Sequence, residues 1–161
     1  MAVLACIGIL SAAETECFKA GNWNYSIWGV KPGYSMKKLP KGVEVSITGE
    51  LGNTPGENNL QMRAIKNGGF DAGRYKIVFQ AKCNKDVMIP VNIIFEQPPY
   101  WGCHKEEIEL KAGKTEKIDI IFELKKHMEK KSLRIPGFAL GKLPVGTVLE
   151  ITDLHVYKIV N

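Results

Sequence analysis

Two apolar runs joined by a short polar turn constrain the fold more than any other feature of the sequence. Apolar and polar side chains alternate in residues 74–83 and alternate again in residues 87–96. A period of two is typical of a strand that is buried on one face only. The intervening residues 84–86, Asn-Lys-Asp, are turn formers. We therefore predict a hairpin whose inner face carries the core, and Pro90 predicts that its second strand lies at a sheet edge or carries a bulge.

The same alternation recurs along the chain, between turns rich in the sixteen glycines and eight prolines. A chain of 161 residues is long enough for one domain with a sizeable core. About nine short strands without an amphipathic helix predict an all-β fold, a two-sheet antiparallel β-sandwich connected as a jelly roll. Further strands are expected at 43–48, 59–64, 118–122, 133–140 and 148–159, the last with a bulge at Thr152 and Asp153, and a loop or single helical turn at 125–131.

The N-terminal segment has the pattern of a secretory signal. Residues 2–10 are apolar and residues 11–13 are small, like the hydrophobic region and cleavage site of a signal peptide. We expect residues 1–13 to be a truncated signal, residues 14–161 to be the mature single domain, and the protein to be secreted. A first strand of the fold and a lipoprotein box ending at Cys6 are the alternatives. The stretch is too short to span a bilayer.

Three cysteines remain in residues 14–161, and their pairing is left open by the sequence. Cys17, Cys83 and Cys103 show no C-x-x-C spacing, so zinc or redox chemistry is not indicated. Cys17 with Cys103 is the more plausible disulfide, and free buried thiols are the alternative.

Several segments of the last hundred or so residues occur in an order that resembles a known family. They are 59–62, the Gly-x-Tyr-x-x-x-Phe-x-Ala strand at 73–82, 133–141 and the closing strand at 146–156. This order is similar to that of carbohydrate-binding modules of the galactose-binding-like jelly-roll superfamily, of the type that accompanies bacterial xylanases and β-glucanases. The N-terminal third departs from it, because Phe18 is followed by Lys19 where the family often has Glu. The resemblance implies non-catalytic binding of a β-glucan-like or xylan-like polysaccharide or oligosaccharide, within a larger glycan-degrading assembly.

Sugar recognition needs flat aromatic faces for pyranose rings and planar polar groups for hydroxyls. The loop at 97–102 is held by Pro98 and Pro99, so we expect Trp101 to be the main platform. Each candidate taken singly has a plainer interpretation as core rim or solvated surface. The candidate carbohydrate-binding residues are the aromatic residues near loops, Trp23, Trp28, Tyr34, Tyr100 and Trp101, and the outward polar residues of predicted strands, Gln61, Arg63, Gln80 and Asn92.

Calcium is the one cofactor that the resemblance implies. Modules of this type often bind Ca²⁺ between the opening and closing strands. Asp153 occupies the corresponding place at the bulge of the last strand, and Glu16 offers oxygen from the first strand. Lys19 beside the opening strand argues against this site, and an ordinary exposed acid is the alternative.

Catalysis and nucleic-acid binding find little support. The sequence has no Gly-x-Ser-x-Gly, no His-Glu-x-x-His and no phosphate-binding Gly-rich loop, and its three histidines lack metal-ligand spacing. The net charge of +5 is spread along the chain, so no nucleic-acid partner is expected. Two rivals remain: a protein-interaction or adhesion sandwich, and a small jelly-roll glycan-active enzyme, for which Glu96 and Glu123 are one possible acid pair.

Overall fold

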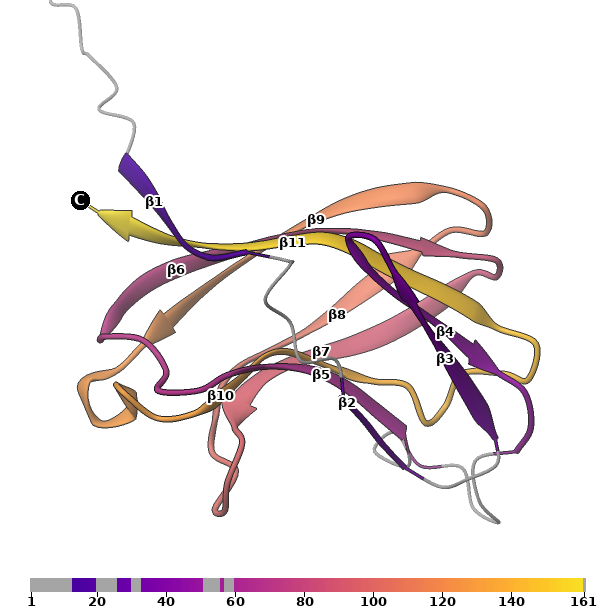
Figure 1. The fold of residues 1–161 in the computed structure, drawn as a ribbon, viewed down its shortest axis with the longest axis horizontal. Helices are drawn as coiled ribbons and strands as arrows, with labels where there is room; N and C mark the ends of the chain where they lie inside the picture. The colour runs from indigo at the N-terminus through magenta and orange to yellow at the C-terminus, as the bar shows by residue number, and fades with distance from the viewer. Residues whose placement is uncertain (1–12, 20–25, 30–32, 51–55, 57–59, 161) are drawn as a thin grey trace, which may run out of the picture.

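Two antiparallel sheets packed face to face make up the computed structural model (Figure 1), which describes residues 13–19, 26–29, 33–50, 56 and 60–160. The strands are β1 (Ala13–Lys19), β2 (Ser26–Gly29), β3 (Tyr34–Leu39), β4 (Gly42–Ile47), β5 (Leu60–Lys66), β6 (Gly73–Cys83), β7 (Val87–Phe95), β8 (Gly102–Leu110), β9 (Thr115–Leu124), β10 (Leu133–Ala139) and β11 (Val148–Val160). This architecture confirms the predicted all-β jelly-roll sandwich.

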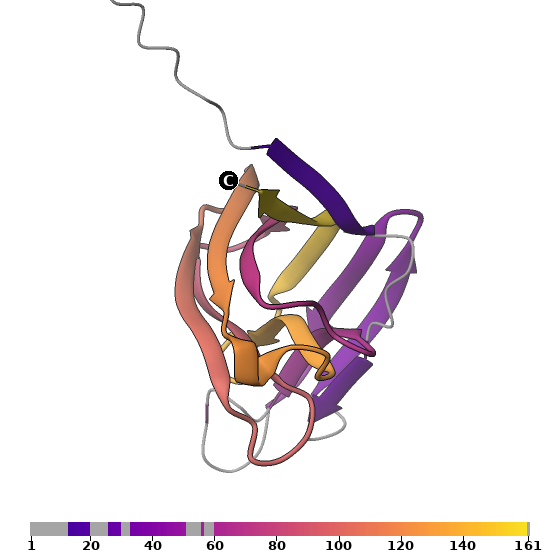
Figure 2. The same cartoon turned by 90° about the vertical axis from the view of Figure 1, so that its left-hand side faces the viewer.

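The strands divide between a six-stranded sheet A and a five-stranded sheet B. Sheet A has the order β3-β4-β11-β6-β9, and β1 pairs with the C-terminal half of β11 beyond the end of β4. Sheet B has the order β2-β5-β10-β7-β8. Figure 2 views the sandwich from the end at which β1 and the C-terminus lie side by side.

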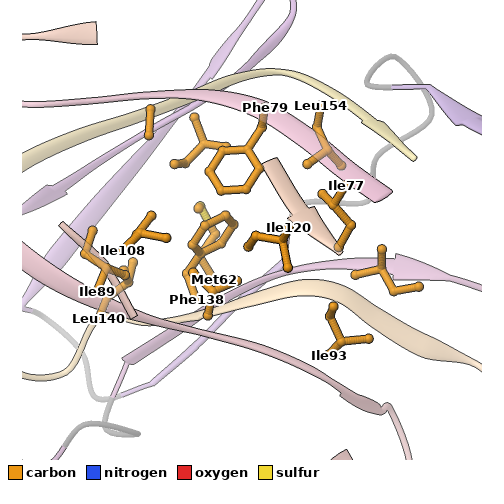
Figure 3. Packing of buried hydrophobic residues seen from close by; sticks show 14 of the residues in the cluster. Met62, Ile77, Phe79, Ile89, Ile93, Ile108, Ile120, Phe138, Leu140 and Leu154 are labelled. Atoms are coloured by element: carbon orange, nitrogen blue, oxygen red, sulfur yellow. The ribbon is translucent and has the colours of Figure 1, made fainter. Parts of the chain in front are cut away.

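The core fills the space between the two sheets, because most strands turn one apolar face inward. In β6 the residues Tyr75, Ile77 and Phe79 are at most 1% exposed, while the residues between them are partly exposed. Figure 3 shows Phe79 of sheet A pointing toward Phe138 and Met62 of sheet B. The rings of Phe79 and Phe138 meet edge to face with centroids 5.5 Å apart. The predicted one-sided burial of these strands is confirmed.

The predicted hairpin of residues 74–96 is wrong. Strand β6 pairs with β11 and β9 in sheet A, whereas β7 pairs with β10 and β8 in sheet B. The turn between them crosses from one sheet to the other. Its side chains bind neighbouring loops, since Asn84 Oδ1 accepts from the Val148 N–H at 2.7 Å and Asp86 Oδ1 accepts from the Ala112 N–H at 2.7 Å. Two one-sided strands that face each other across a core have the same sequence pattern as a hairpin.

Pro90 lies neither at a sheet edge nor at a bulge. Strand β7 runs between β10 and β8, and its described register shifts lie beyond Pro90, between Ile93 and Ile94 on the β8 side and between Asn92 and Ile94 on the β10 side. The pairing of β7 with β10 ends at Val91, so Pro90 needs no N–H for that ladder.

Three other local features bear on the predictions. The bulge expected in the last strand is confirmed: the register of β11 with β6 shifts between Thr152 and His155, and Asp153 has φ 50°. Residues Lys126–Met128 form the expected single turn, a 3-10 helix. Strand β3 was not predicted, because four of its six residues are exposed and the apolar alternation is absent.

Of the predicted signal segment, only Ala13 lies within the described residues, where it begins β1. The signal, its cleavage near Glu14 and secretion therefore stay predictions. No helix among the described residues is long and apolar enough to cross a membrane.

The three described cysteines are free, so the Cys17–Cys103 disulfide is not formed. Cys17 lies in β1 of sheet A and Cys103 in β8 of sheet B. Each thiol donates to a backbone carbonyl at 3.2 Å, Cys17 to Val156 and Cys103 to Ile93. Burial raises the pKa of both thiols, that of Cys103 from 9.0 to about 11.

We expect the raised pKa of Cys103 to make the fold less stable in alkali. The folded chain holds this proton to a higher pH than the unfolded chain, so the stabilisation is complete below the ordinary pKa of 9.0 and is lost as the pH rises toward about 11. Urea unfolding of the wild type and of Cys103→Ala across this interval measures the contribution. The free energy of unfolding of Cys103→Ala should fall less steeply with rising pH than that of the wild type. Equal slopes would contradict the assignment of this pH dependence to Cys103.

Candidate functional site

The outer face of sheet B carries a row of polar residues across neighbouring strands. Arg63 of β5 lies opposite Gly137 of β10, Gly137 lies opposite Asn92 of β7, and Asn92 lies opposite Lys105 of β8. Residues directly opposite each other point to the same side of a sheet. The inward neighbours in this register, such as Phe138, are buried in the core, so the row faces outward.

Arg134 of β10 is the centre of the polar contacts on this face. Its Nε donates to Glu96 Oε2 at 2.6 Å, and its Nη1 donates to Gln61 Oε1 at 2.8 Å. The other oxygen of Glu96, Oε1, lies 3.0 Å from Arg63 Nη1. One carboxylate therefore joins two guanidinium groups and links β5, β10 and the end of β7.

These groups are held in a partly dry environment. Arg134 is only 8% exposed, and the side chains of Arg63 and Glu96 are each 19% exposed. Charge-assisted hydrogen bonds are stronger where water is largely excluded. The ion pairs and hydrogen bonds therefore hold these side chains against one another.

The local backbone of β10 makes room for Arg134. The register with both neighbouring strands shifts between Arg134 and Gly137, and this segment contains a cis peptide bond before Pro136. A Cβ on Gly137 would lie 3.6 Å from Arg134 Cβ and 3.7 Å from Arg134 Cδ. The arginine chain thus passes beside the glycine at ordinary van der Waals distance.

Tyr100 lies over Arg134 at the rim of the sheet. Its ring centroid is 5.3 Å from Arg134 Cζ, within the range of a cation–π contact. A turn sets its position, since the Tyr100 N–H donates to the Gln97 carbonyl at 3.0 Å and Tyr100 has φ 54°. The residue remains 49% exposed. We call these five residues the Arg134 cluster: Gln61, Arg63, Glu96, Tyr100 and Arg134.

Trp101 has different surroundings from its neighbour Tyr100. Its ring centroid lies 6.4 Å from that of Phe95 and 6.3 Å from that of His127 in the 3-10 turn, and the residue is 57% exposed. Phe95 belongs to the core and His127 to the connection before β10. Trp101 is therefore supported by the end of the sandwich, while Tyr100 is supported by the Arg134 cluster.

The structure brings together only some of the predicted binding residues. Gln61, Arg63 and Asn92 share the outer face of sheet B near Tyr100, and the backbone of Trp28 in β2 lies opposite Gln61. Gln80 and Tyr34 belong to sheet A. Trp23 lies outside the described residues.

Gln80 and Tyr34 do not lie with the other candidate carbohydrate-binding residues. Gln80 is exposed between Thr152 and Lys117 on sheet A, and Tyr34 packs partly buried against the core at the edge of that sheet. Gln80 was grouped with the others because an outward position in a strand does not tell which of two sheets the strand joins. Tyr34 was grouped with them as an aromatic residue near a loop, and it begins β3.

Two members of the Arg134 cluster were not predicted as binding residues. Glu96 was considered only as one half of an acid pair, and Arg134 was not singled out. A signal was present for Arg134, because it is the only charged residue in the run 133–140. A lone cation inside an apolar strand usually has a buried partner.

The acids proposed for calcium do not form one site in the described residues. Glu16 Oε1 lies 2.5 Å from His155 Nδ1, and Asp153 Oδ1 lies 3.5 Å from Lys41 Nζ. The part of the chain that the structure describes contains no group of three His, Cys, Asp or Glu residues able to hold a metal ion. Ca²⁺ takes six to eight oxygen ligands, so these two carboxylates do not fit it by themselves, and calcium binding stays a prediction.

The acid pair considered for glycoside hydrolysis is also separated. Glu96 follows β7 and lies on the outer face of sheet B, whereas Glu123 is exposed on β9, opposite Arg74 on sheet A. Both oxygens of Glu96 contact guanidinium groups. The two carboxyl groups therefore lie on different sheets and do not face each other as the acid pair of a glycosidase would.

Comparison with solved structures places the fold among carbohydrate-binding modules. A CBM4 module is 16% identical in sequence, with a TM-score of 0.62 over 80% of this chain and 86% of that chain. The N-terminal cellulose-binding domain of β-1,4-glucanase C from Cellulomonas fimi is 11% identical, with a TM-score of 0.59 over 85% and 90% of the two chains.

A third solved structure is larger than this chain. The CBM22-1 and GH10 modules of a xylanase from Clostridium thermocellum, complexed with xylohexaose, are 13% identical, with a TM-score of 0.58 over 85% of this chain and 26% of that chain. Comparison with protein-family models and with curated proteins finds no match. The chain thus has the jelly-roll fold of carbohydrate-binding modules at low sequence identity.

Proposed function

From this shared fold and the polar face of sheet B, we propose that the chain binds a polysaccharide or oligosaccharide without catalysing a reaction. The Arg134 cluster, with Tyr100 over a network of planar polar groups, is the observation that carries the proposal. The sugar chain would lie on the outer face of sheet B, across the row that contains Arg63 and Asn92.

The chemistry of the cluster suits a sugar ring. Guanidinium and amide groups hydrogen-bond hydroxyls in a fixed plane, and an aromatic ring packs against the apolar face of a pyranose. Each hydroxyl hydrogen bond replaces one made to water and contributes only about 0.5–1.5 kcal/mol. We therefore assign much of the affinity to the half-exposed ring of Tyr100.

Preorganisation supports the same site. Glu96 fixes both arginines, and Arg134 supports one side of the Tyr100 ring. Side chains already ordered in the free protein lose little conformational entropy on binding. The proposed ligand is a β-glucan-like or xylan-like chain, because one structural neighbour is a cellulose-binding domain and another is complexed with xylohexaose. Secretion and a place in a larger glycan-degrading assembly belong to the same proposal.

A matched pair of variants tests the site. In gels containing soluble β-glucan or xylan, we expect Tyr100→Ala to lose at least about fivefold in affinity, because one aromatic stack contributes about 1 kcal/mol or more. Trp101, which the sequence made the main platform, packs against Phe95 and His127 outside the Arg134 cluster. We therefore expect Trp101→Ala, which removes an exposed aromatic residue of the same loop, to keep most of the retardation. Thermal unfolding of each variant checks that the fold is intact.

Other outcomes of this experiment identify the error. Loss of binding in Trp101→Ala alone would place the site at the end of the sandwich, beside His127. Absence of retardation by every glycan would end the proposal and favour a protein partner. Release of reducing sugar by the wild type would show a glycan-active enzyme instead.

A further inference from the structure

The Arg134 cluster has more unused hydrogen-bond donors than unused side-chain acceptors around Arg134. Both oxygens of Glu96 and the side-chain oxygen of Gln61 already contact guanidinium nitrogens. Arg134 uses Nε and Nη1 for these bonds, and the described residues offer its Nη2 no hydrogen-bond partner. The side-chain oxygens of Glu96 and Gln61 are thus engaged, while the N–H groups of Arg134 Nη2 remain as donors.

These remaining donors lie in a protected place. Arg134 is 8% exposed and sits between Gln61 and the ring of Tyr100. A buried donor without a partner costs free energy, so a native structure normally satisfies it or reserves it for a ligand. The Nη2 group therefore indicates where a ligand acceptor would bind.

The donor excess distinguishes between classes of sugar. A hydroxyl group can both donate and accept a hydrogen bond. In a site that offers mainly donors, its own O–H therefore finds no acceptor. A carboxylate only accepts, and guanidinium groups bind it with charge-assisted bonds. The formal net charge of +5 also favours an anionic ligand.

We propose that the glycan bound by the Arg134 cluster carries carboxylate groups, as in a chain containing uronic acid residues. One carboxylate accepts hydrogen bonds from Arg134 Nη2 while its sugar ring packs on Tyr100. This inference rests on the proposed function, since it names the class of glycan for the same site.

The wild-type protein tests the proposal with matched ligands. C6-oxidised cello-oligosaccharides and their methyl esters share one backbone and differ in the charge of the carboxyl group. Calorimetric titration should show the acid binding at least about tenfold more tightly than the ester. Added salt should reduce this preference, because it screens the charge interaction.

Two variants locate the preference. Arg134→Gln should bind acid and ester alike, whereas Lys117→Gln should retain the preference. Lys117 is the matched control, because its side chain is 70% exposed on β9 of sheet A and its replacement removes the same charge.

Three results would overturn the proposal. Equal affinity of the wild type for acid and ester would exclude the carboxylate class while leaving glycan binding in place. A preference that survives in Arg134→Gln would place the anion elsewhere. Failure to bind acid, ester and neutral glycans would remove the proposed function as well. If Arg134→Gln does not fold, the acid–ester comparison on the wild type decides.

Discussion

Replacement of Phe79 by alanine is expected to lower the free energy of unfolding by about 3–5 kcal/mol. Phe79 lies in the middle of β6, is 0% exposed, and packs its ring edge to face against Phe138 of the opposite sheet at 5.5 Å. Truncation removes buried apolar surface and leaves a cavity between the two sheets. The surrounding core residues relax only partly, so the sheets do not close this cavity.

The control is the truncation of a large apolar residue on the surface of the neighbouring strand β9. Ile121 of β9 is 46% exposed, so Ile121→Ala should cost well under about 1 kcal/mol. Urea unfolding of both variants and the wild type measures the difference. A loss below about 1 kcal/mol for Phe79→Ala would mean that this position is not packed as the structure describes.

Glu96→Gln should have the second largest effect on stability. The substitution keeps the size of the side chain and removes the charge that joins Arg63 and Arg134. The two guanidinium groups then lie close together in a largely buried place without their shared carboxylate. Because the Glu96 side chain is 19% exposed, we expect a loss of about 2–4 kcal/mol, at or below the cost of breaking a fully buried pair.

The control for this variant is Glu123→Gln. Glu123 is exposed on β9, so the same loss of charge there should change the free energy of unfolding by no more than about 0.5 kcal/mol. Chemical unfolding at one ionic strength measures both variants. Equal small losses would show that Glu96 holds no structural ion pair.

The alternation of apolar residues predicted which side chains are buried but not which strands pair. Tyr75, Ile77 and Phe79 were placed inward, and they are buried. Their strand was joined to β7 in a hairpin, yet the two strands lie in different sheets. A period of two shows only that one face of a strand is buried. The next strand along the chain can lie beside it in the same sheet or across the core in the other sheet, and the pattern is the same in both cases.

The sequence predicted candidate binding residues one at a time, from outward strand positions for Gln61, Arg63 and Asn92 and from its loop for Tyr100. Sheet B brings the first three to one face. Gln80 has the same pattern but lies on sheet A. Glu96 and Arg134 are separated by 38 positions in the chain, and their contact depends on the pairing of β10 with β7, which the sequence did not predict.

The central claim is that glycan lies on the outer face of sheet B, and nuclear magnetic resonance measures this most directly. The backbone amides of the labelled full chain are followed while the glycan that binds is added. We predict that the amides of Arg63, Asn92, Tyr100, Arg134 and Gly137 shift together and saturate with one affinity. Shifts confined to sheet A around Gln80, or to the end of the sandwich around Trp101 and His127, would contradict the account.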